Sequence, residues 1–376
     1  MRVTFLTIMP SPYSLDLFAA MEVDGRIEPR VLYMEMSAPD THWGQVPLPD
    51  SAKVLAGGWK SLGGGRIHWN PEAINGVRRS RPDLVVVAGY SSLTSQVVMR
   101  WLHRKNIPWI FWGEIPGMRS LGLWGRMMRA LAQSQPLRRA DAIAAVGSQA
   151  VAEYRRLARP GCDVANIPYF IDLKPFLDLP MARRTVALRL LYCGQLIERK
   201  GVESLVDAFA DVAADYADLE LLLVGEGPLR ASLSQRIPAR VRHRVVFTGF
   251  QAVDRLPTLF GTADLFVLPS LHDGWGVVLN QALGAGLPII SSRSVGAAAD
   301  VVSPGQNGFV FPPGNVPALA AAIRSLVSDH ERRLTFAQNS RAAAQQWTPS
   351  KGVDRWVDLA ERVLRRRSAT TSRSTV

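Results

Sequence analysis

Short apolar runs alternate with helical patterns along almost the whole chain. The runs are four to six residues long and consist mainly of Val, Ile, Leu and Ala. Such runs are typical of buried parallel strands, because a strand covered by helices on both faces does not alternate polar and apolar side chains. The pattern therefore predicts an α/β protein. We expect strands at residues 3–8, 84–88, 109–112, 142–146, 190–193, 219–224, 245–248, 265–268 and 288–291.

A proline-containing segment between Pro168 and Leu190 interrupts this pattern and predicts a domain boundary. A chain of 376 residues is too long for one ordinary hydrophobic core. We therefore expect two Rossmann-like domains facing across a cleft, with ligands bound beyond the carboxyl ends of the strands. The expected parts are residues 1–174, residues 175–348, a C-terminal helix at 349–366 that crosses back to the first domain, and a disordered polar tail at 367–376.

The stretch 264–292 is the most informative for chemistry. Its apolar run ends at Pro269, and a helical pattern starts near Gly276 and ends at Gly286. The loop between them is rich in glycine, which lets the backbone approach a ligand closely. Free amides at the positive end of the helix favour an anion, most simply a phosphate. The loop residues are Asp273, Gly274, Trp275 and Gly276, and the amides are those of Gly276, Val277 and Val278.

A second loop follows the expected strand at 190–193. Gly194 ends that strand, and Arg199 and Lys200 stand at the mouth of the next helix. Cations in this position can neutralise a departing diphosphate. Alone they would indicate only a solvated surface loop, but with the glycine-rich loop after Pro269 in the same sheet we favour phosphate binding.

A third loop contains Gly225 and Gly227 after the strand at 219–224. The spacing is similar to a dinucleotide fingerprint, but Arg230 stands where the third glycine is needed. A nicotinamide cofactor is therefore not expected. The two glycines also fit a tight strand-to-helix turn with no ligand.

The charge of the chain bears on its partners. The formal net charge is +12, and arginines cluster at several points. Such a surplus favours an anionic bilayer or a polyanion, or it forms a solvated surface, and the composition leaves these alternatives open. We find no recognisable nucleic-acid motif, so nucleic acid is not an expected partner.

Residues 121–137 form a basic amphipathic pattern. Its large apolar residues are Leu123, Trp124, Met127, Met128 and Leu131, and they stand beside Arg126 and Arg129. A helix of this kind can lie in a bilayer interface and bring a lipid-linked acceptor to the site. It can equally cover the first sheet, and this core role is our preferred prediction.

Cysteine usage and hydropathy indicate the cellular compartment of the protein. Cys162 and Cys193 stand in unrelated segments and make no disulfide framework. No run reaches the roughly 20 apolar residues that a membrane-spanning helix needs. We expect a cytoplasmic protein that can lie on the inner face of the cell membrane.

The second half of the chain resembles the GT-B glycosyltransferases, specifically the large retaining family 4, group 1, of bacterial polysaccharide and lipopolysaccharide enzymes. The resemblance covers residues 190–343 in several ordered blocks, and the first half matches more loosely. It implies that Gly194–Gln195 and Lys200–Gly201 hold the donor diphosphate, with Gln195 in place of the usual arginine and Arg199 as a substitute charge.

The same resemblance assigns further donor residues. Two family glutamates fall on Asp273, which keeps the carboxylate, and on Gln281, whose amide can still bind ribose hydroxyls. The segment ending at Phe250 corresponds to the strand and loop that meet the base. Tyr169–Phe170 replace the usual asparagine-glycine pair.

Acceptor chemistry is expected in the first domain. Glu114 follows the strand at 109–112 and can act as an acceptor-side base or positioning group, or it can cap a helix. No histidines pair at metal-ligand spacing, and no aspartate-x-aspartate motif is present, so neither a metal nor a cofactor is expected.

The resemblance implies a retaining transferase that moves a sugar from a nucleotide-diphosphate sugar to a glycan or lipid-linked acceptor. Lys200, Asp273 and Glu114 are its predicted catalytic residues. The alternative is a non-catalytic nucleotide-sugar-binding protein or partner subunit, since Gln195 and Gln281 depart from the family pattern. A sugar-nucleotide epimerase is a third possibility.

Overall fold

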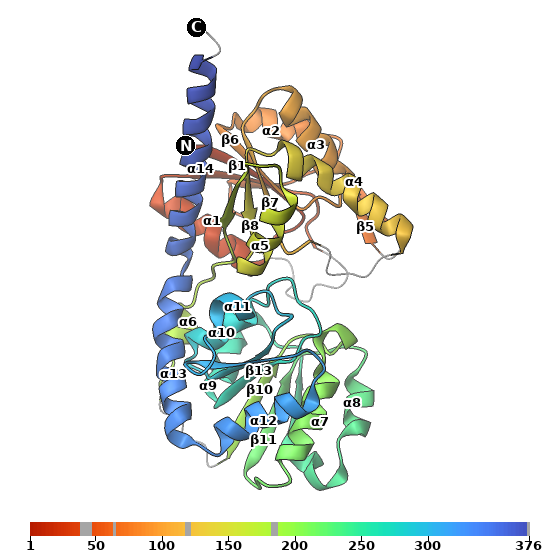
Figure 1. The fold of residues 1–376 in the computed structure, drawn as a ribbon, viewed down its shortest axis with the longest axis vertical. Coiled ribbons are helices and arrows are strands. Elements are labelled where there is room, and N and C mark those ends of the chain that lie inside the picture. Colours follow the sequence, from red (N-terminus) through yellow and green to blue (C-terminus); the bar gives the residue numbers. More distant parts are fainter. Residues whose placement is uncertain (38–46, 63–64, 117–121, 182–186, 374–376) are drawn as a thin grey trace. The chain divides into compact units, whose positions relative to one another are not determined.

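The computed structural model describes residues 1–37, 47–62, 65–116, 122–181 and 187–373. The chain forms two compact units (Figure 1). The first unit contains Met1–Ile171 together with Pro349–Val376, and the second contains Asp172–Thr348. Each unit has its own parallel sheet and its own hydrophobic core.

The sheet of the first unit has the strand order β3-β2-β1-β6-β7-β8-β9, and every neighbouring pair is parallel. A separate antiparallel hairpin consists of β4 and β5. The strands are β1 (Arg2–Thr7), β2 (Glu28–Tyr33), β3 (Ala52–Val54), β4 (Gly58–Leu62), β5 (Gly65–Trp69), β6 (Leu84–Ala88), β7 (Trp109–Gly113), β8 (Ala142–Ala145) and β9 (Asp163–Asn166). The helices are α1 (Pro12–Asp24), α2 (Ala73–Ser80), α3 (Leu93–Arg104), α4 (Leu123–Arg139), α5 (Ser148–Leu157) and α14 (Pro349–Arg373).

The sheet of the second unit has the order β12-β11-β10-β13-β14-β15 and is also parallel. Its strands are β10 (Leu188–Cys193), β11 (Leu219–Val224), β12 (Val245–Gly249), β13 (Leu265–Leu268), β14 (Ile289–Ser292) and β15 (Gly308–Phe311). Its helices are α6 (Lys174–Leu177), α7 (Val202–Val212), α8 (Arg230–Arg236), α9 (Leu256–Gly261), α10 (Val278–Gly284), α11 (Ala298–Val301), α12 (Val316–Val327) and α13 (His330–Ala344). The 3₁₀ turns in the described part of this unit are η1 (Glu198–Lys200), η2 (Ala239–Arg244), η3 (Val253–Arg255) and η4 (Gln345–Trp347).

The α/β class and the two Rossmann-like units confirm the predicted fold. All nine expected strands are present, with ends shifted by no more than two residues. Strands β2, β3, β9 and β15 and the β4–β5 hairpin were not predicted. The missed strand β9 shows why: it is an edge strand of sequence DVAN with one buried side chain, so it lacks the apolar run on which the prediction depends.

Helix α14 returns to the first unit, as predicted. Its Trp356 is buried and meets Phe5 and Trp112 edge-on, with ring centroids 5.4 and 5.3 Å apart. The helix continues to Arg373, through residues that the sequence analysis assigned to the tail. Ion pairs explain part of this extension, because Arg367 binds Asp141 at 2.7 Å.

The predicted core role of the 121–137 segment is wrong. In α4 the five large apolar side chains lie at the surface, with exposed fractions of 76% for Leu123 and 77% for Trp124. Only the C-terminal part of the helix is anchored, because Gln135 and Pro136 are buried and the Gln96 amide donates to the Ala132 carbonyl oxygen at 2.8 Å. Among the described residues, no helix combines the length and hydropathy needed to cross a membrane.

Gly352 tests how α14 is held. A Cβ at this position would lie 2.6 Å from Phe170 Cδ2 and 2.9 Å from Leu17 Cδ1. Overpacking costs about 1–3 kcal/mol, whereas alanine gains only about 1 kcal/mol in helix propensity. We therefore expect Gly352→Ala to lower the free energy of unfolding, measured by urea denaturation, while Lys351→Ala on the exposed side changes it by less than about 0.5 kcal/mol. A Gly352→Ala variant as stable as the parent would contradict this packing.

Candidate functional site

The candidate site of the second unit lies along one edge of its sheet. In a parallel sheet the carboxyl ends of all strands meet at the same edge, and the loops that follow β10, β11, β12 and β13 lie there. Backbone hydrogen bonds join three of these loops, since Gly194 N–H donates to Val224 O and Gly225 N–H donates to Gly249 O, each at 2.9 Å. Phe250 follows directly and is 47% exposed.

The glycines after β11 are required by close contact between loops. A Cβ on Gly225, whose φ is +134°, would lie 1.9 Å from Gly194 O, and a Cβ on Gly227 would lie 2.4 Å from Leu196 O. This packing fits the tight-turn interpretation of the two glycines. It also places the backbone of Gly225 beside that of Gly194 at the predicted donor side.

Gln195 is held in place through its backbone. The buried Tyr192 hydroxyl donates to Gln195 O at 2.7 Å. Burial raises the pKa of this tyrosine well above its ordinary value, so the hydroxyl stays a donor. Burial also raises the pKa of the neighbouring Cys193 thiol to about 12, so that thiol adds no charge to the loop.

The loop after β10 is pressed against the end of β13. Gly201 has a φ of +64°, and a Cβ there would lie 2.3 Å from Pro269 O. The Leu271 N–H donates to Arg199 O at 2.9 Å. These two contacts fix the backbone on both sides of Lys200 next to the loop that contains Asp273.

The side chains then form a compact charged cluster, which we call the Lys200–Asp273 cluster and define as Arg199, Lys200 and Asp273. Lys200 Nζ lies 2.5 Å from Asp273 Oδ2, and these side chains are only 14% and 12% exposed. Arg199 Nη1 lies 3.8 Å from Asp273 Oδ1 and donates to His272 O at 3.2 Å. Two cations against one carboxylate leave a net positive charge, in a partly shielded place where charges act more strongly than in water.

Backbone hydrogen bonds join the loop that contains Asp273 to the segment after β14. Asp273 N–H donates to Ser294 O, and Gly296 N–H donates to Asp273 O, both at 3.0 Å. The neighbouring Gly274 carbonyl packs where a Cβ on Gly296 would stand, at 2.2 Å. The position of the Asp273 carboxylate is therefore set by backbone contacts on both sides.

Two predicted donor residues in this loop have restricted roles. The Trp275 ring is 2% exposed and its Nε1 donates to Asn280 Oδ1 at 3.0 Å, so only its backbone is available for the predicted contact. Gly276 has a φ of +87°, and a Cβ there would lie 2.7 Å from Val295 Cγ1. Only glycine fits this turn without displacing Val295.

Helix α10 begins two residues later than expected, at Val278, and has seven residues. Its first donor is the Leu279 N–H, which binds Gly276 O at 2.9 Å, so the amides of Gly276, Val277 and Val278 precede the hydrogen-bonded turns. A helix this short contributes little dipole, so most of the positive charge comes from Arg199 and Lys200. Gln281, one turn further, is half-buried, and its contact with ribose stays a prediction.

Glu114 lies in the first unit, after β7, and is exposed. The Tyr169 hydroxyl donates to Glu114 Oε1 at 3.0 Å, and the Tyr154 hydroxyl donates to Glu114 O at 2.8 Å. Burial and the Glu114 charge raise the pKa of Tyr169 well above its ordinary value, so Tyr169 remains a hydrogen-bond donor. The helix-capping alternative is wrong, because the next helix, α4, begins after Gly122 and has no side-chain cap.

One polar cluster of the first unit was not predicted. Glu35 and His68 make a buried contact just beyond the carboxyl end of β2: His68 Nε2 lies 3.1 Å from Glu35 Oε1, and the side chains of Glu35 and His68 are 8% and 4% exposed. The Asn70 amide donates to Met34 O at 2.9 Å and accepts from Thr94 Oγ1 at 3.1 Å. Each residue stands alone in its own segment, so the sequence carries no signal that they meet.

The contact at Gly201 gives a direct test of the site's architecture. Gly201→Ala combines an unfavourable left-handed backbone with a steric clash, whereas Gly305→Ala has the same backbone problem at φ +75° but nothing within 4 Å of the new Cβ. We expect Gly305→Ala to cost about 1–2 kcal/mol and Gly201→Ala to cost about 1–3 kcal/mol more, measured by urea unfolding. Equal losses in the two variants would show that the close approach to Pro269 is not a constraint.

Comparison with known proteins finds similarity to glycosyl transferases in part of the chain. Residues 184–343 match the family described as "Glycosyl transferases group 1". The alpha-D-kanosaminyltransferase of Streptomyces kanamyceticus is 28% identical over 220 residues, which are 56% of this chain and 57% of that protein. The N-acetyl-alpha-D-glucosaminyl L-malate synthase of Bacillus anthracis is 26% identical over 238 residues, or 61% of each chain. The matches thus span less than two thirds of these curated relatives.

Solved structures resemble the whole chain. HepE of Anabaena in complex with UDP has a TM-score of 0.74 at 19% identity and covers 96% of this chain and 100% of its own. The sucrose-phosphate synthase of Thermosynechococcus elongatus has a TM-score of 0.72 at 20% identity and covers 96% and 99%. At these identities the likeness shows the fold. The chain therefore has the GT-B fold of two Rossmann-like units, and its residues 184–343 are similar to the group 1 glycosyl transferases.

Proposed function

We propose that this protein transfers a sugar from a nucleotide-diphosphate sugar to a glycan or lipid-linked acceptor, with retention of the anomeric configuration and without a metal ion. The family of residues 184–343 and the transferase names of the relatives support a sugar transfer. The observation that carries the proposal is the Lys200–Asp273 cluster, which places two cations at the strand edge where ligands of such sheets bind. Synthesis of a cell-surface polysaccharide or glycolipid is the proposed setting.

In the proposed reaction the bond between the anomeric carbon and the diphosphate breaks, and a bond from that carbon to an acceptor oxygen forms. Lys200 and Arg199 stabilise the negative charge that develops on the departing diphosphate. Asp273 favours the positive charge that develops at the anomeric carbon. The acceptor proton leaves with the diphosphate or passes to Glu114, whose carboxylate is oriented by Tyr169.

The other predicted donor residues are proposed to bind the nucleotide. Phe250 and Gly225 lie at the end of the sheet edge away from Asp273, where they are proposed to hold the base. The backbone of the Asp273–Gly276 loop and the amides of Val277 and Val278 are proposed to contact phosphate oxygens. Gln281 is proposed to bind ribose hydroxyls through its amide.

Removing the Lys200 charge tests the catalytic assignment. We expect Lys200→Met to lower turnover about 10²–10³-fold across a panel of nucleotide-diphosphate sugars, because preorganised charge at the leaving group is lost. Lys174→Met is the matched control, since Lys174 also pairs with an aspartate in the same unit but is 77% exposed. Sugar transfer that survives Lys200→Met unchanged would exclude the proposed role.

The variant Gln281→Glu distinguishes the proposed transferase from a non-catalytic nucleotide-sugar-binding protein. A charged partner for the ribose hydroxyls should tighten donor binding in either case. Turnover in both forms supports the transferase, whereas binding without transfer or hydrolysis in either form supports a nucleotide-sugar-binding protein. Isomerised donor in the absence of acceptor would indicate an epimerase.

We further propose that α4 holds the protein on the inner face of the cell membrane. The exposed face of Leu123, Trp124, Met127, Met128 and Leu131 lies beside Arg126 and Arg129 on one helix. Such a helix lies in the interface of an anionic bilayer, with its apolar side chains in the acyl boundary and its arginines at the head groups.

Vesicle sedimentation tests this attachment. We expect the parent protein to bind phosphatidylglycerol vesicles more tightly than phosphatidylcholine vesicles, and Trp124→Ser/Met128→Ser to weaken binding by about tenfold or more, because buried apolar area is lost. Val23→Ser removes another exposed apolar side chain, 90% exposed, and should have no effect. Equal sedimentation of the double variant and the parent would rule out α4 as the attachment.

A further inference from the structure

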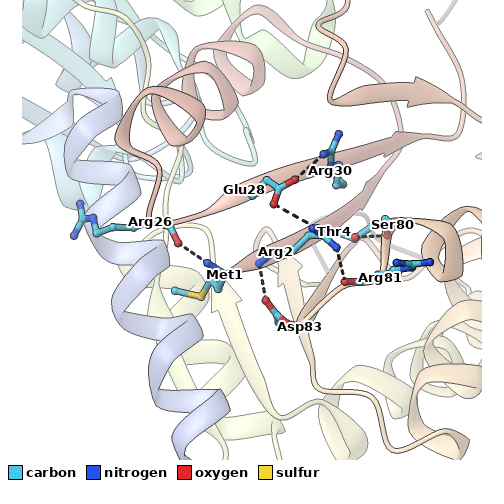
Figure 2. Close-up of polar contacts among 9 residues, drawn as sticks. All are labelled: Met1, Arg2, Thr4, Arg26, Glu28, Arg30, Ser80, Arg81 and Asp83. Atoms are coloured by element: carbon cyan, nitrogen blue, oxygen red, sulfur yellow. Dashed lines mark hydrogen bonds and ion pairs between the residues drawn. The ribbon is translucent and has the colours of Figure 1, made fainter.

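A basic hollow lies at the amino edge of the first unit's sheet, the edge opposite to Glu114. Its volume is about 420 Å³, and it is lined by Arg2, Arg30, Arg79, Ser80 and Arg81. Three elements supply these residues: Arg2 begins β1, Arg30 stands in β2, and the other three end α2 and lead into β6. Figure 2 draws Arg2, Arg30, Ser80 and Arg81 of this lining, together with the carboxylates of Glu28 and Asp83.

The positive charge of the hollow is only partly balanced. Glu28 binds Arg30 at 2.6 Å and Arg2 at 3.4 Å, and the Arg30 contact lowers the pKa of Glu28, so that carboxyl stays charged. Asp83 is engaged by the Arg2 backbone N–H at 2.7 Å. Within the described part of the chain, Arg79 and Arg81 make no ion pair. Glu72, at the start of α2, also interacts electrostatically with Arg79. The four guanidinium groups nevertheless outnumber the carboxylates Glu28, Glu72 and Asp83.

The backbone at Arg81 is a second observation. Arg81 follows α2 with φ 47° and ψ 59°, a left-handed conformation that usually carries glycine or asparagine at a helix end. Among the described residues, the only other non-glycine residue with positive φ is Asn106, a type that tolerates it. An arginine kept in an unfavourable backbone conformation indicates a requirement for its side chain.

The floor of the hollow is fixed. Ser80 Oγ lies 2.7 Å from Thr4 Oγ1 and donates to Val77 O at 2.7 Å, which ties the end of α2 to β1. The neighbouring Arg78 does not belong to the hollow, because its guanidinium lies over the Trp101 ring, 5.4 Å from the centroid. In the last turn of α2, Arg78 therefore packs on Trp101, and Arg79 lines the hollow.

We propose that this hollow binds a phosphate-bearing dianion. Guanidinium groups match phosphate oxygens with paired N–H donors, and the negative charge of a phosphate group matches the excess of positive charge in the hollow. A free phosphate compound and a lipid phosphate head group share this chemistry. The hollow belongs to the first unit and shares no residue with the Lys200–Asp273 cluster, so the inference does not rest on the proposed function.

Site-resolved arginine labelling tests the proposal without an activity assay. The full chain is treated with phenylglyoxal with and without pyrophosphate, and modification of each arginine is followed by peptide mass spectrometry. We expect labelling of Arg79 and Arg81 to slow about threefold when two thirds of the hollow is occupied. Arg100, an exposed arginine of α3 outside the hollow, is the internal control and should react at an unchanged rate.

Variants separate binding from folding. Arg81→Gly relieves the left-handed backbone and removes one charge, so we expect unchanged or higher thermal stability and about a tenfold rise in the pyrophosphate concentration that half-protects Arg79. Arg100→Gln should change neither quantity. If the same pyrophosphate concentration half-protects Arg79 in the Arg81→Gly variant and in the parent protein, the proposal is overturned.

A parallel arm identifies the source of the phosphate group. Dihexanoyl phosphatidic acid, used as a dissolved monomer, replaces pyrophosphate in the same labelling experiment. Protection by both compounds supports a site for any phosphate monoester or diphosphate, and protection by the lipid alone assigns a lipid head group. No protection of the hollow by either compound, or equal protection of Arg100, would overturn the proposal.

Discussion

The approach of Gly201 to the Pro269 carbonyl oxygen is the constraint on which the candidate site depends. It leaves no room for a side chain and brings the loop after β10 onto the end of β13. Because these strands are parallel neighbours, two charged residues 73 positions apart in sequence, Lys200 and Asp273, meet with their side chains mostly shielded from solvent. The chemistry proposed for the second unit follows from a packing contact between backbones.

Shielding Lys200 and Asp273 from solvent costs hydration free energy, and contacts made by the surrounding loops offset this cost. A partly buried cation and carboxylate lose hydration, and the pair is favourable only when its geometry is held by other contacts. Here the hydrogen bonds of Asp273 to Ser294 and Gly296 hold the acidic side, and the Arg199–Leu271 backbone bond holds the basic side. Arg199 adds a second positive charge beside Lys200 at this carboxylate.

The first unit distributes its charge differently. Its carboxyl edge carries acidic groups that are bound by neighbours, Glu114 to Tyr169 and Glu35 to His68, whereas its amino edge gathers arginines with few acidic partners. The Tyr169 hydroxyl donates to the Glu114 carboxylate and so orients it.

The sequence by itself determined nine of the strands, the parallel arrangement of the two main sheets and the loops that carry the predicted donor-side residues. It could do so because apolar runs and glycine positions are local properties of the chain. The tertiary structure alone decided that the Trp275 ring is buried, that α4 exposes its apolar face, and that Glu35 meets His68. Those outcomes depend on which segments pack together, and a residue's own neighbours in sequence hold no information about a partner many positions away.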